Sequence, residues 1–227
     1  SKGKPVAAIG TGSSGTQAIP EIAKEAVHVT VLQRTPQFAF PAGNRPVTPE
    51  EMAKARESWG TIKATMIAHG GGFPSDAQTR SALEDTPEQR DALYEKLWQR
   101  GGFGFFLESY NDIAISEEAN QTMADFVRGK IRKIVKDPKI ADKLMPDHFV
   151  MTKRPILDNG YFETFNRDNV TLVDLREDPI ERFTPQSVVT RTGEHPIDML
   201  VLATGFDAIS GTMLRLNPMG RGGVRLK

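Results

Sequence analysis

The stretch from residue 5 to residue 33 constrains the fold of this chain more than any other part of its sequence. It joins a short apolar run, PVAAI, to a glycine-rich turn, GTGSSG, and then to a helical pattern and the alternating run VHVTVLQ. Apolar and β-branched runs of this length are typical of strands buried in a parallel sheet. The order strand, turn, helix, strand therefore predicts a βαβ unit and an α/β fold class.

The three glycines of this turn have the spacing of a dinucleotide-binding fingerprint. Gly10 permits a tight turn, Gly12 lets the backbone approach a pyrophosphate, and Gly15 lets the helix pack against the strand. Free amides at the helix start favour phosphate, and two serine hydroxyls add donors. A turn without any ligand is the alternative. The cofactor-binding residues predicted for this unit are Gly10, Thr11, Gly12, Ser13, Ser14, Gly15 and Gln17.

The end of the second strand indicates which dinucleotide is bound. An acidic residue there accepts hydrogen bonds from the ribose of NAD, whereas an arginine accommodates the 2′-phosphate of NADP. This chain has Arg34 followed by Thr35 at that point. A guanidinium meets a phosphate with two charge-assisted hydrogen bonds, so we predict NADP(H) as the coenzyme. The alternative is that Arg34 is a solvated surface residue.

The remaining sequence divides into a helical part and a second α/β part. Residues 47–147 hold helical patterns and few strand-like runs, for example a single helix across TPEEMAKARESWGTIKATMIAH, whereas NVTLVDL, SVVTRTG and IDMLVLATG in residues 148–227 read as strands. We predict a Rossmann-like, NADPH-binding domain with a parallel sheet, formed by residues 1–46 and 148–227. Residues 47–147 are predicted to form a helical insertion that interrupts it.

Composition narrows the functional classes. The 29 basic residues equal the 29 acidic ones, so no global charge favours nucleic acid or an anionic membrane. No apolar run approaches the roughly 20 residues that span a bilayer. The chain has no cysteine, and its four histidines lack metal-ligand spacing, so no metal site is predicted. These features predict a soluble, cytoplasmic protein that has neither a nucleic-acid nor a membrane partner.

Two later segments, KRPILDNGYFETFNRDNVTLVDL and DMLVLATGFDAISG, join IGTGSSG and LQRTPQFAFPAGNRP in one order along the chain. Together they resemble Baeyer–Villiger monooxygenases of the cyclohexanone, phenylacetone and steroid monooxygenase type. The resemblance covers nearly the whole chain. It implies an enzyme that uses FAD, NADPH and dioxygen to convert ketones to esters or lactones. It also implies that this chain is the NADPH-binding part, and that a domain binding most of the FAD is missing from it.

The resemblance assigns roles to four further residues. Arg154 corresponds to the catalytic arginine that stabilises the negatively charged peroxyflavin, and Lys153 to a residue contacting the 2′-phosphate. Thr204 and Gly205 of the ATGFD segment are expected near the cofactor, or alternatively in a turn that ends a buried strand. The residues HFVM before Lys153 depart from the family pattern, which usually has glycine or proline, and this leaves the conformation of that loop open.

Two other readings of the sequence stay open. If the protein consists of these residues alone, it is a stand-alone NADP-binding module without catalysis, because the flavin site then has no walls. A fragment of another two-dinucleotide flavoprotein oxidoreductase is the third possibility, and the long helical segment argues against it. Neither the ketone nor the oligomeric state follows from the sequence.

Overall fold

The computed structural model describes residues 1–75, 78–207 and 210–225. Ala208 and Ile209, which belong to the segment DMLVLATGFDAISG discussed above, lie outside the described residues. The strands are β1 (Pro5–Ile9), β2 (His28–Gln33), β3 (Ala39–Pro41), β4 (Ile156–Asp158), β5 (Val170–Asp174), β6 (Ile180–Thr184), β7 (Ser187–Thr190), β8 (Glu194–Pro196) and β9 (Met199–Leu202). The α-helices are α1 (Ser13–Glu25), α2 (Pro49–Glu57), α3 (Trp59–Ala68), α4 (Pro87–Arg100), α5 (Gly104–Leu107), α6 (Glu117–Ile134), α7 (Pro138–Leu144), α8 (Tyr161–Thr164) and α9 (Ser210–Leu216), with short 3-10 turns η1 (Ala82–Glu84) and η2 (Arg221–Gly223).

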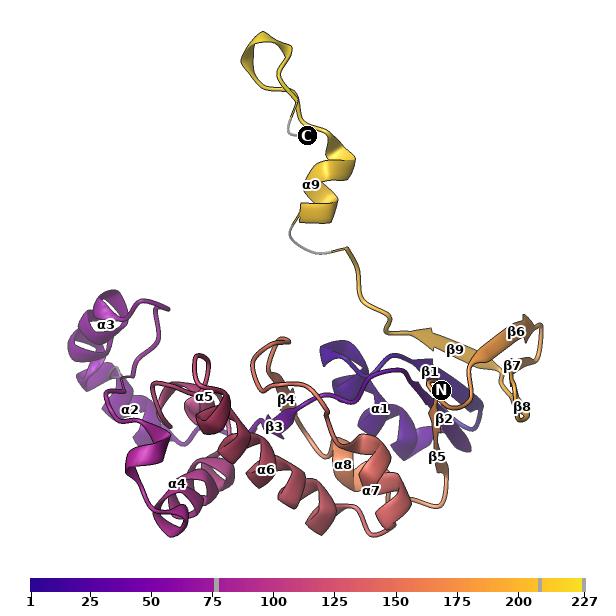
Figure 1. Ribbon diagram of the computed structural model, residues 1–227, viewed down its shortest axis with the longest axis horizontal. Helices are drawn as coiled ribbons and strands as arrows, with labels where there is room; N and C mark the ends of the chain where they lie inside the picture. Colours follow the sequence, from indigo (N-terminus) through magenta and orange to yellow (C-terminus); the bar gives the residue numbers. More distant parts are fainter. Residues whose placement is uncertain (76–77, 208–209, 226–227) are drawn as a thin grey trace.

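A four-stranded parallel sheet organises the fold. Its strand order is β5-β2-β1-β9, and β1, α1 and β2 form the predicted βαβ unit. Strands from both ends of the sequence therefore lie side by side in one sheet (Figure 1). The predicted α/β fold class with a parallel sheet is confirmed, and the strand order reverses between β1 and β9. In such sheets ligands bind at the carboxyl ends of the strands, beside the reversal.

The two faces of the sheet are covered by different partners. Val6 and Ala8 of β1 belong to a large apolar cluster that also contains residues of α1, α8 and α6. Ala7, between them, points to the opposite face, where it belongs to a second cluster with Val188 of β7. This alternation follows from the two-residue period of a strand. A three-stranded antiparallel sheet, β6-β7-β8, covers the second face.

Between β3 and β4 the described residues contain helices and turns but no strand. α6 contributes buried residues at helical spacing, among them Met123, Val127 and Ile131, to the same apolar cluster as the sheet. The helical part and the sheet therefore share one core on this face. No helix in the described part of the chain is long and apolar enough to cross a membrane.

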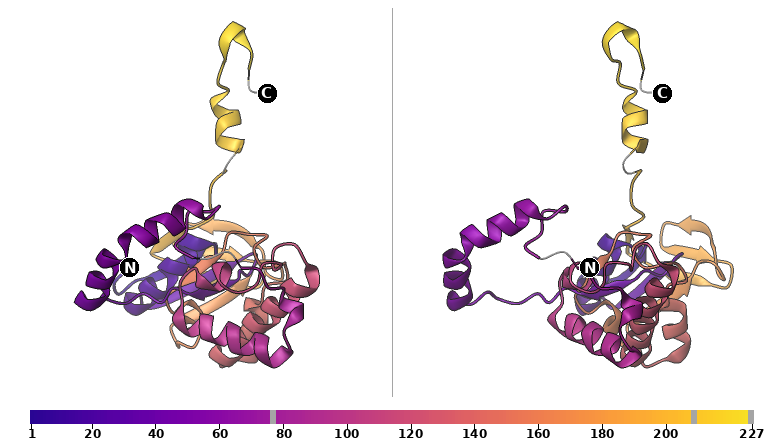
Figure 2. Two further views of the ribbon diagram at one scale, coloured as in Figure 1. Left: turned by 90° about the vertical axis from the view of Figure 1, so that its left-hand side faces the viewer. Right: turned by 60° about the vertical axis from the view of Figure 1, so that its left-hand side comes forward.

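The prediction of a single helix across residues 48–69 was wrong. The segment forms two helices, α2 and α3, which meet at Ser58. Neither helix has a buried residue, so no packing face stabilises one continuous helix against the weak helix propensities of Ser58 and Gly60. In Figure 2 this pair of helices stands away from the rest of the molecule. The segment that carries α9 stands away from it as well.

Candidate functional site

A cavity of about 390 Å³ lies at the carboxyl edge of the parallel sheet. Its volume is within the usual range of small-molecule and cofactor sites. All four strands of the sheet contribute residues at or just after their carboxyl ends, and Lys153 comes from the loop before β4. The lining residues are Ile9, Gly10, Thr11, Gly12, Leu32, Arg34, Thr35, Gln37, Lys153, Leu175, Ala203, Thr204 and Gly205.

Two glycines of the turn are required by the protein's own packing. Gly10 has a φ of +101°, and a Cβ added there would overlap the carbonyl of Ala203, which follows β9. A Cβ added at Gly15 would overlap the carbonyl of Gly10 itself. The turn, the start of α1 and the end of β9 therefore approach one another as closely as backbones can.

Gly12 is different, because nothing in the protein requires a glycine there. Its φ is −78°, which any residue adopts, and a Cβ added to it would have no neighbour within 4 Å. Gly12 is the N-cap of α1, and no side chain caps the helix. The first amides of α1 thus lack a side-chain acceptor beside open space, which is the arrangement that receives an anion at a helix start.

Two cations lie at the rim of this cavity. Arg34 follows β2, and Lys153 comes from the loop before β4. Both side chains are exposed, and neither has a hydrogen bond or salt bridge to any described residue. No carboxylate lines the cavity. The cavity therefore offers two uncompensated positive charges, which favour a phosphate.

The acidic group that NAD sites use is absent from the matching place among the described residues. Gln33, the last residue of β2, is buried, and its Nε2 donates to the Lys143 carbonyl at 2.8 Å. Asp174, at the end of the adjacent β5, is held by Arg176 at 2.9 Å. Burial acts to raise the pKa of Asp174, but hydrogen bonds from Arg176 outweigh it and the pKa lies below its usual value. This carboxylate is thus already engaged by a cation.

Arg154 lies beside the cavity rather than in it. It lines a small adjoining crevice, also formed by Phe38, Phe106 and His148. Gln37 and Lys153 line both spaces, so the two are neighbours. Arg154 is exposed and, among the described residues, has no hydrogen-bond or salt-bridge partner. The guanidinium of Arg154 is thus a third unpaired cation, next to those of Arg34 and Lys153.

Some predicted site residues lie outside the cavity lining. Ser13 and Ser14 are exposed on the first turn of α1, and Gln17 is exposed one turn further on. Gly15 is buried beneath the turn. The sequence interpretation overlooked Gln37 and Leu175, which do line the cavity. For Leu175 the signal was available, because it is the last residue of NVTLVDL, a segment expected to form a strand.

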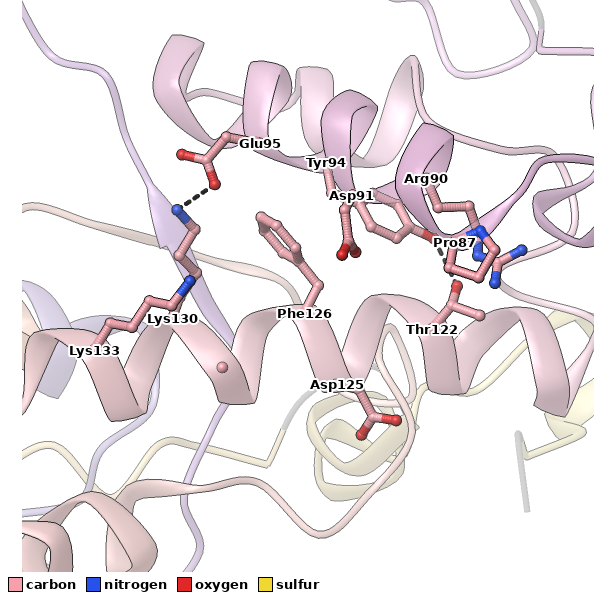
Figure 3. Close-up of a pocket in the computed structure, with 11 residues that line it drawn as sticks. Pro87, Arg90, Asp91, Tyr94, Glu95, Thr122, Asp125, Phe126, Lys130 and Lys133 are labelled. Carbon is pink, nitrogen blue, oxygen red and sulfur yellow. Dashed lines mark hydrogen bonds and ion pairs between the residues drawn. The ribbon is translucent and has the colours of Figure 1, made fainter.

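A larger cavity lies elsewhere. A groove of about 640 Å³ runs between α4 and α6 (Figure 3). Acidic and basic side chains are mixed along it, Lys130 forms an ion pair with Glu95, and Arg90 donates to backbone carbonyls. Carboxylates line this groove, whereas none lines the cavity at the sheet edge, so size alone does not identify the site.

A parallel sheet with a glycine turn, an uncapped helix start and free cations at its carboxyl edge is the architecture of dinucleotide-binding α/β domains.

No family model matches the chain. Curated proteins do: it is 43% identical to a Baeyer–Villiger monooxygenase of Pseudooceanicola batsensis, over 99% of this chain and 41% of that protein. It is 42% identical to cyclohexanone 1,2-monooxygenase of an Acinetobacter species, over 100% of this chain and 42% of that protein.

Solved structures agree. The crystal structure of OTEMO in complex with FAD and NADP matches with a TM-score of 0.94 and 40% identity, over 99% of this chain and 42% of that one. Over nearly its whole length the chain is thus similar to part of enzymes of the Baeyer–Villiger monooxygenase family. It spans about two fifths of the length of the curated relatives that it matches.

Proposed function

We propose that this chain is the NADPH-binding portion of an FAD-dependent Baeyer–Villiger monooxygenase. The observation that carries the proposal is the pair of unpartnered cations, Arg34 and Lys153, at the rim of a cavity that contains no carboxylate. The relatives' names and the NADP complex of OTEMO support the same coenzyme. The whole enzyme would convert a ketone to an ester or lactone with dioxygen and NADPH.

The residues present fit the coenzyme. The pyrophosphate would lie against Gly12 and the first amides of α1, where no Cβ and no cap compete for the space. The 2′-phosphate would be bound by Arg34 and Lys153, with Thr35 as a further donor. Thr204 and Gly205 would border the coenzyme on the side of β9. NADPH supplies a hydride and FAD the oxygen-transferring chemistry when both are bound.

Arg154 is the catalytic residue that we propose from this chain. Guanidinium stays protonated at any working pH and offers a fixed set of donors, so it holds a positive charge beside the coenzyme cavity. Its place next to Lys153 and Gln37 supports a role where the two cofactors meet. Stabilising an anion that forms during oxygen transfer would be its contribution.

A flavin-binding domain is the proposed partner of this chain. Beyond β9 the described residues expose large apolar side chains: Phe206 is 91% exposed, and Leu216 and Val224 are each 70% exposed. α9 has no buried residue. An apolar surface of this kind is typical of a contact with another domain.

With no cysteine to oxidise, the protein is compatible with the reducing cytoplasm, where we propose that it works.

The proposal is tested by measuring dissociation constants for NADPH and NADH in the whole protein. The unaltered protein should bind NADPH more tightly. Arg34→Ala should weaken NADPH binding by roughly 10-fold to 100-fold, because one charge-assisted pair to phosphate is lost, and leave NADH nearly unchanged.

Arg56→Ala is the matched control. Arg56 is an exposed arginine of α2 that lines neither the cavity nor the adjoining crevice, so its loss should not alter either constant. Equal affinities for the two coenzymes in the unaltered protein would contradict the proposal.

A further inference from the structure

The loop that carries Lys153 and Arg154 is fixed at both ends. On one side Ile156 begins β4 and pairs with Ala39 of β3. On the other side, Val150 is buried with 2% of its surface exposed. Thr152, Lys153 and Arg154 between these points are exposed. The positions of both cations are therefore set by the backbone that precedes and follows them.

The preceding backbone forms a tight turn from Phe149 to Thr152. The Thr152 amide donates to the Phe149 carbonyl at 3.3 Å, and the Thr152 hydroxyl donates to the same carbonyl at 2.7 Å. Met151, the third residue of the turn, has a φ of +70°, whereas Val150 has no positive φ. A positive φ confined to the third residue is the mark of a type II turn.

A type II turn is an unfavourable choice for this sequence. Its third position needs a left-handed backbone, which glycine adopts freely and a methionine adopts only with strain. A type I turn over the same four residues would give Met151 a negative φ. The two types differ mainly in the orientation of one peptide group, the one whose carbonyl belongs to Val150. Something must hold that carbonyl in its type II orientation.

The side-chain amide of Asn120 holds it. Asn120 lies on α6 and is buried, with 4% of its surface exposed. Its Nδ2 donates to the Val150 carbonyl at 3.0 Å, and its Oδ1 accepts from the Val150 amide at 2.9 Å. Nδ2 also donates to the Ile113 carbonyl at 2.7 Å, which fixes the side chain itself.

We propose that Asn120 is a positioning residue for coenzyme recognition. By binding both polar groups of the Val150 backbone, Asn120 keeps the turn from Phe149 to Thr152 in its type II form. The type II turn then determines where Lys153 lies at the cavity rim. The inference rests on the proposed function, since it gives Lys153 the 2′-phosphate as ligand. It also gives the helical part of the chain a task at the site, because α6 belongs to residues 47–147.

The test compares dissociation constants for NADP⁺ and NAD⁺ in the whole protein. Asn120→Ala should reduce the preference for NADP⁺ by on the order of 10-fold, the effect of one charge-assisted contact, while NAD⁺ affinity changes little. Adding Met151→Gly to Asn120→Ala should restore most of the preference, because glycine favours the left-handed position without help from Asn120. A residue with only a structural role would show neither the selective loss nor this rescue.

Asn166→Ala is the matched control. Asn166 also joins two segments through its side-chain amide, with Nδ2 donating to the Ile134 carbonyl and Oδ1 accepting from the Lys136 amide, both at 2.8 Å. It lines neither the cavity nor the adjoining crevice. This variant should lose stability and keep the coenzyme preference. An unchanged preference in Asn120→Ala, or an equal loss in Asn166→Ala, would overturn the proposal.

Amide hydrogen exchange separates this inference from the proposed function. Exchange in a peptide covering residues 149–156 should be faster in Asn120→Ala and slow again when Met151→Gly is added, with no coenzyme present. Unchanged exchange in Asn120→Ala would overturn the proposed role of Asn120. A protein that did not discriminate between the coenzymes, yet showed this exchange pattern, would refute the NADPH assignment and leave the turn mechanism supported.

Discussion

At the scale of single residues, the glycine turn separates what the fold requires from what a ligand requires. Gly10 and Gly15 meet backbone carbonyls where a Cβ would stand, so the protein needs them even without coenzyme. Gly12 meets nothing and has an ordinary φ. Its lack of a side chain is useful only if another molecule occupies the space beside it.

This difference predicts opposite results for two alanine substitutions. Gly15→Ala should destabilise the protein by about 2 kcal/mol, the usual range for forcing extra atoms into a packed site. Gly12→Ala should change stability by less than about 1 kcal/mol, since it only replaces a mediocre helix cap, but should weaken NADPH binding. Urea unfolding and coenzyme titration of both variants check this. Normal NADPH affinity in Gly12→Ala would show that the coenzyme does not bind against the turn.

The candidate site was partly predictable from the sequence at this scale. The glycine turn and Arg34 were found because they belong to a local pattern with fixed spacing. Lys153, Thr204 and Gly205 came only from the family resemblance, yet the cavity brings them beside the turn. Gln37 was missed because a loop glutamine carries no local signal, and its place depends on where the chain turns after β2.

At the scale of elements, long segments were easier to predict than short ones. The strands β1, β2, β5 and β9 and the helices α4 and α6 were expected, since their apolar periodicity and caps extend over many residues. β3 and β4 are only three residues long and were not foreseen, because their pairing with each other supplies the stability that the sequence pattern lacks. The break at Ser58 was missed for the opposite reason, since propensity suggested a helix that no packing supports.

The short helix α8 carries a pH-dependent cap. Asp158 accepts a hydrogen bond from the Tyr161 amide, and burial raises the pKa of Asp158 from 3.8 to about 6 despite that bond. A carboxyl group with a raised folded-state pKa stabilises the protein below pH 3.8 and loses that contribution as the pH rises to about 6.

Asp158→Asn should therefore remove a pH effect. Relative to this variant, the unaltered protein should lose on the order of 2 kcal/mol of unfolding free energy between pH 4 and about pH 6. Asparagine keeps an oxygen acceptor for the helix amide, so the variant should fold. Denaturant unfolding across this range is the measurement. Parallel pH profiles for the two proteins would show that Asp158 titrates normally.

At the scale of the whole molecule, the core joins parts that the sequence suggested were separate. Residues of α1, α6 and the parallel sheet share one apolar cluster. The predicted domain boundaries at residues 46 and 147 stay predictions. A helical part that formed a separate unit would be expected to have its own core and to pack on itself, whereas α6 shares the core of the sheet. Sequence patterns identify elements well, but they do not tell which elements share a core.

The segment after β9 should be cut by a protease well before the packed helices are. Arg215 and Arg221 lie on α9 and η2, which have no buried residues, and this segment projects from the body in every view (Figures 1 and 2). Lys130, by contrast, lies on packed α6 and is paired with Glu95. Brief trypsin digestion followed by mass spectrometry should find cleavage after Arg215 or Arg221 at least about 10-fold faster than after Lys130. Similar rates would mean that the segment docks on the body.

The pairing of β1 with β9 also orders events during synthesis. Residues 6–9 align with residues 199–202, and the carbonyl that packs on Gly10 belongs to Ala203. A chain still growing on the ribosome has β1 long before it has this partner, and contacts of such sequence separation form slowly. Until roughly two hundred further residues have emerged after β1, one edge of β1 has no partner strand and the cavity lacks the residues that follow β9, so this is the interval in which we expect the protein to need a chaperone.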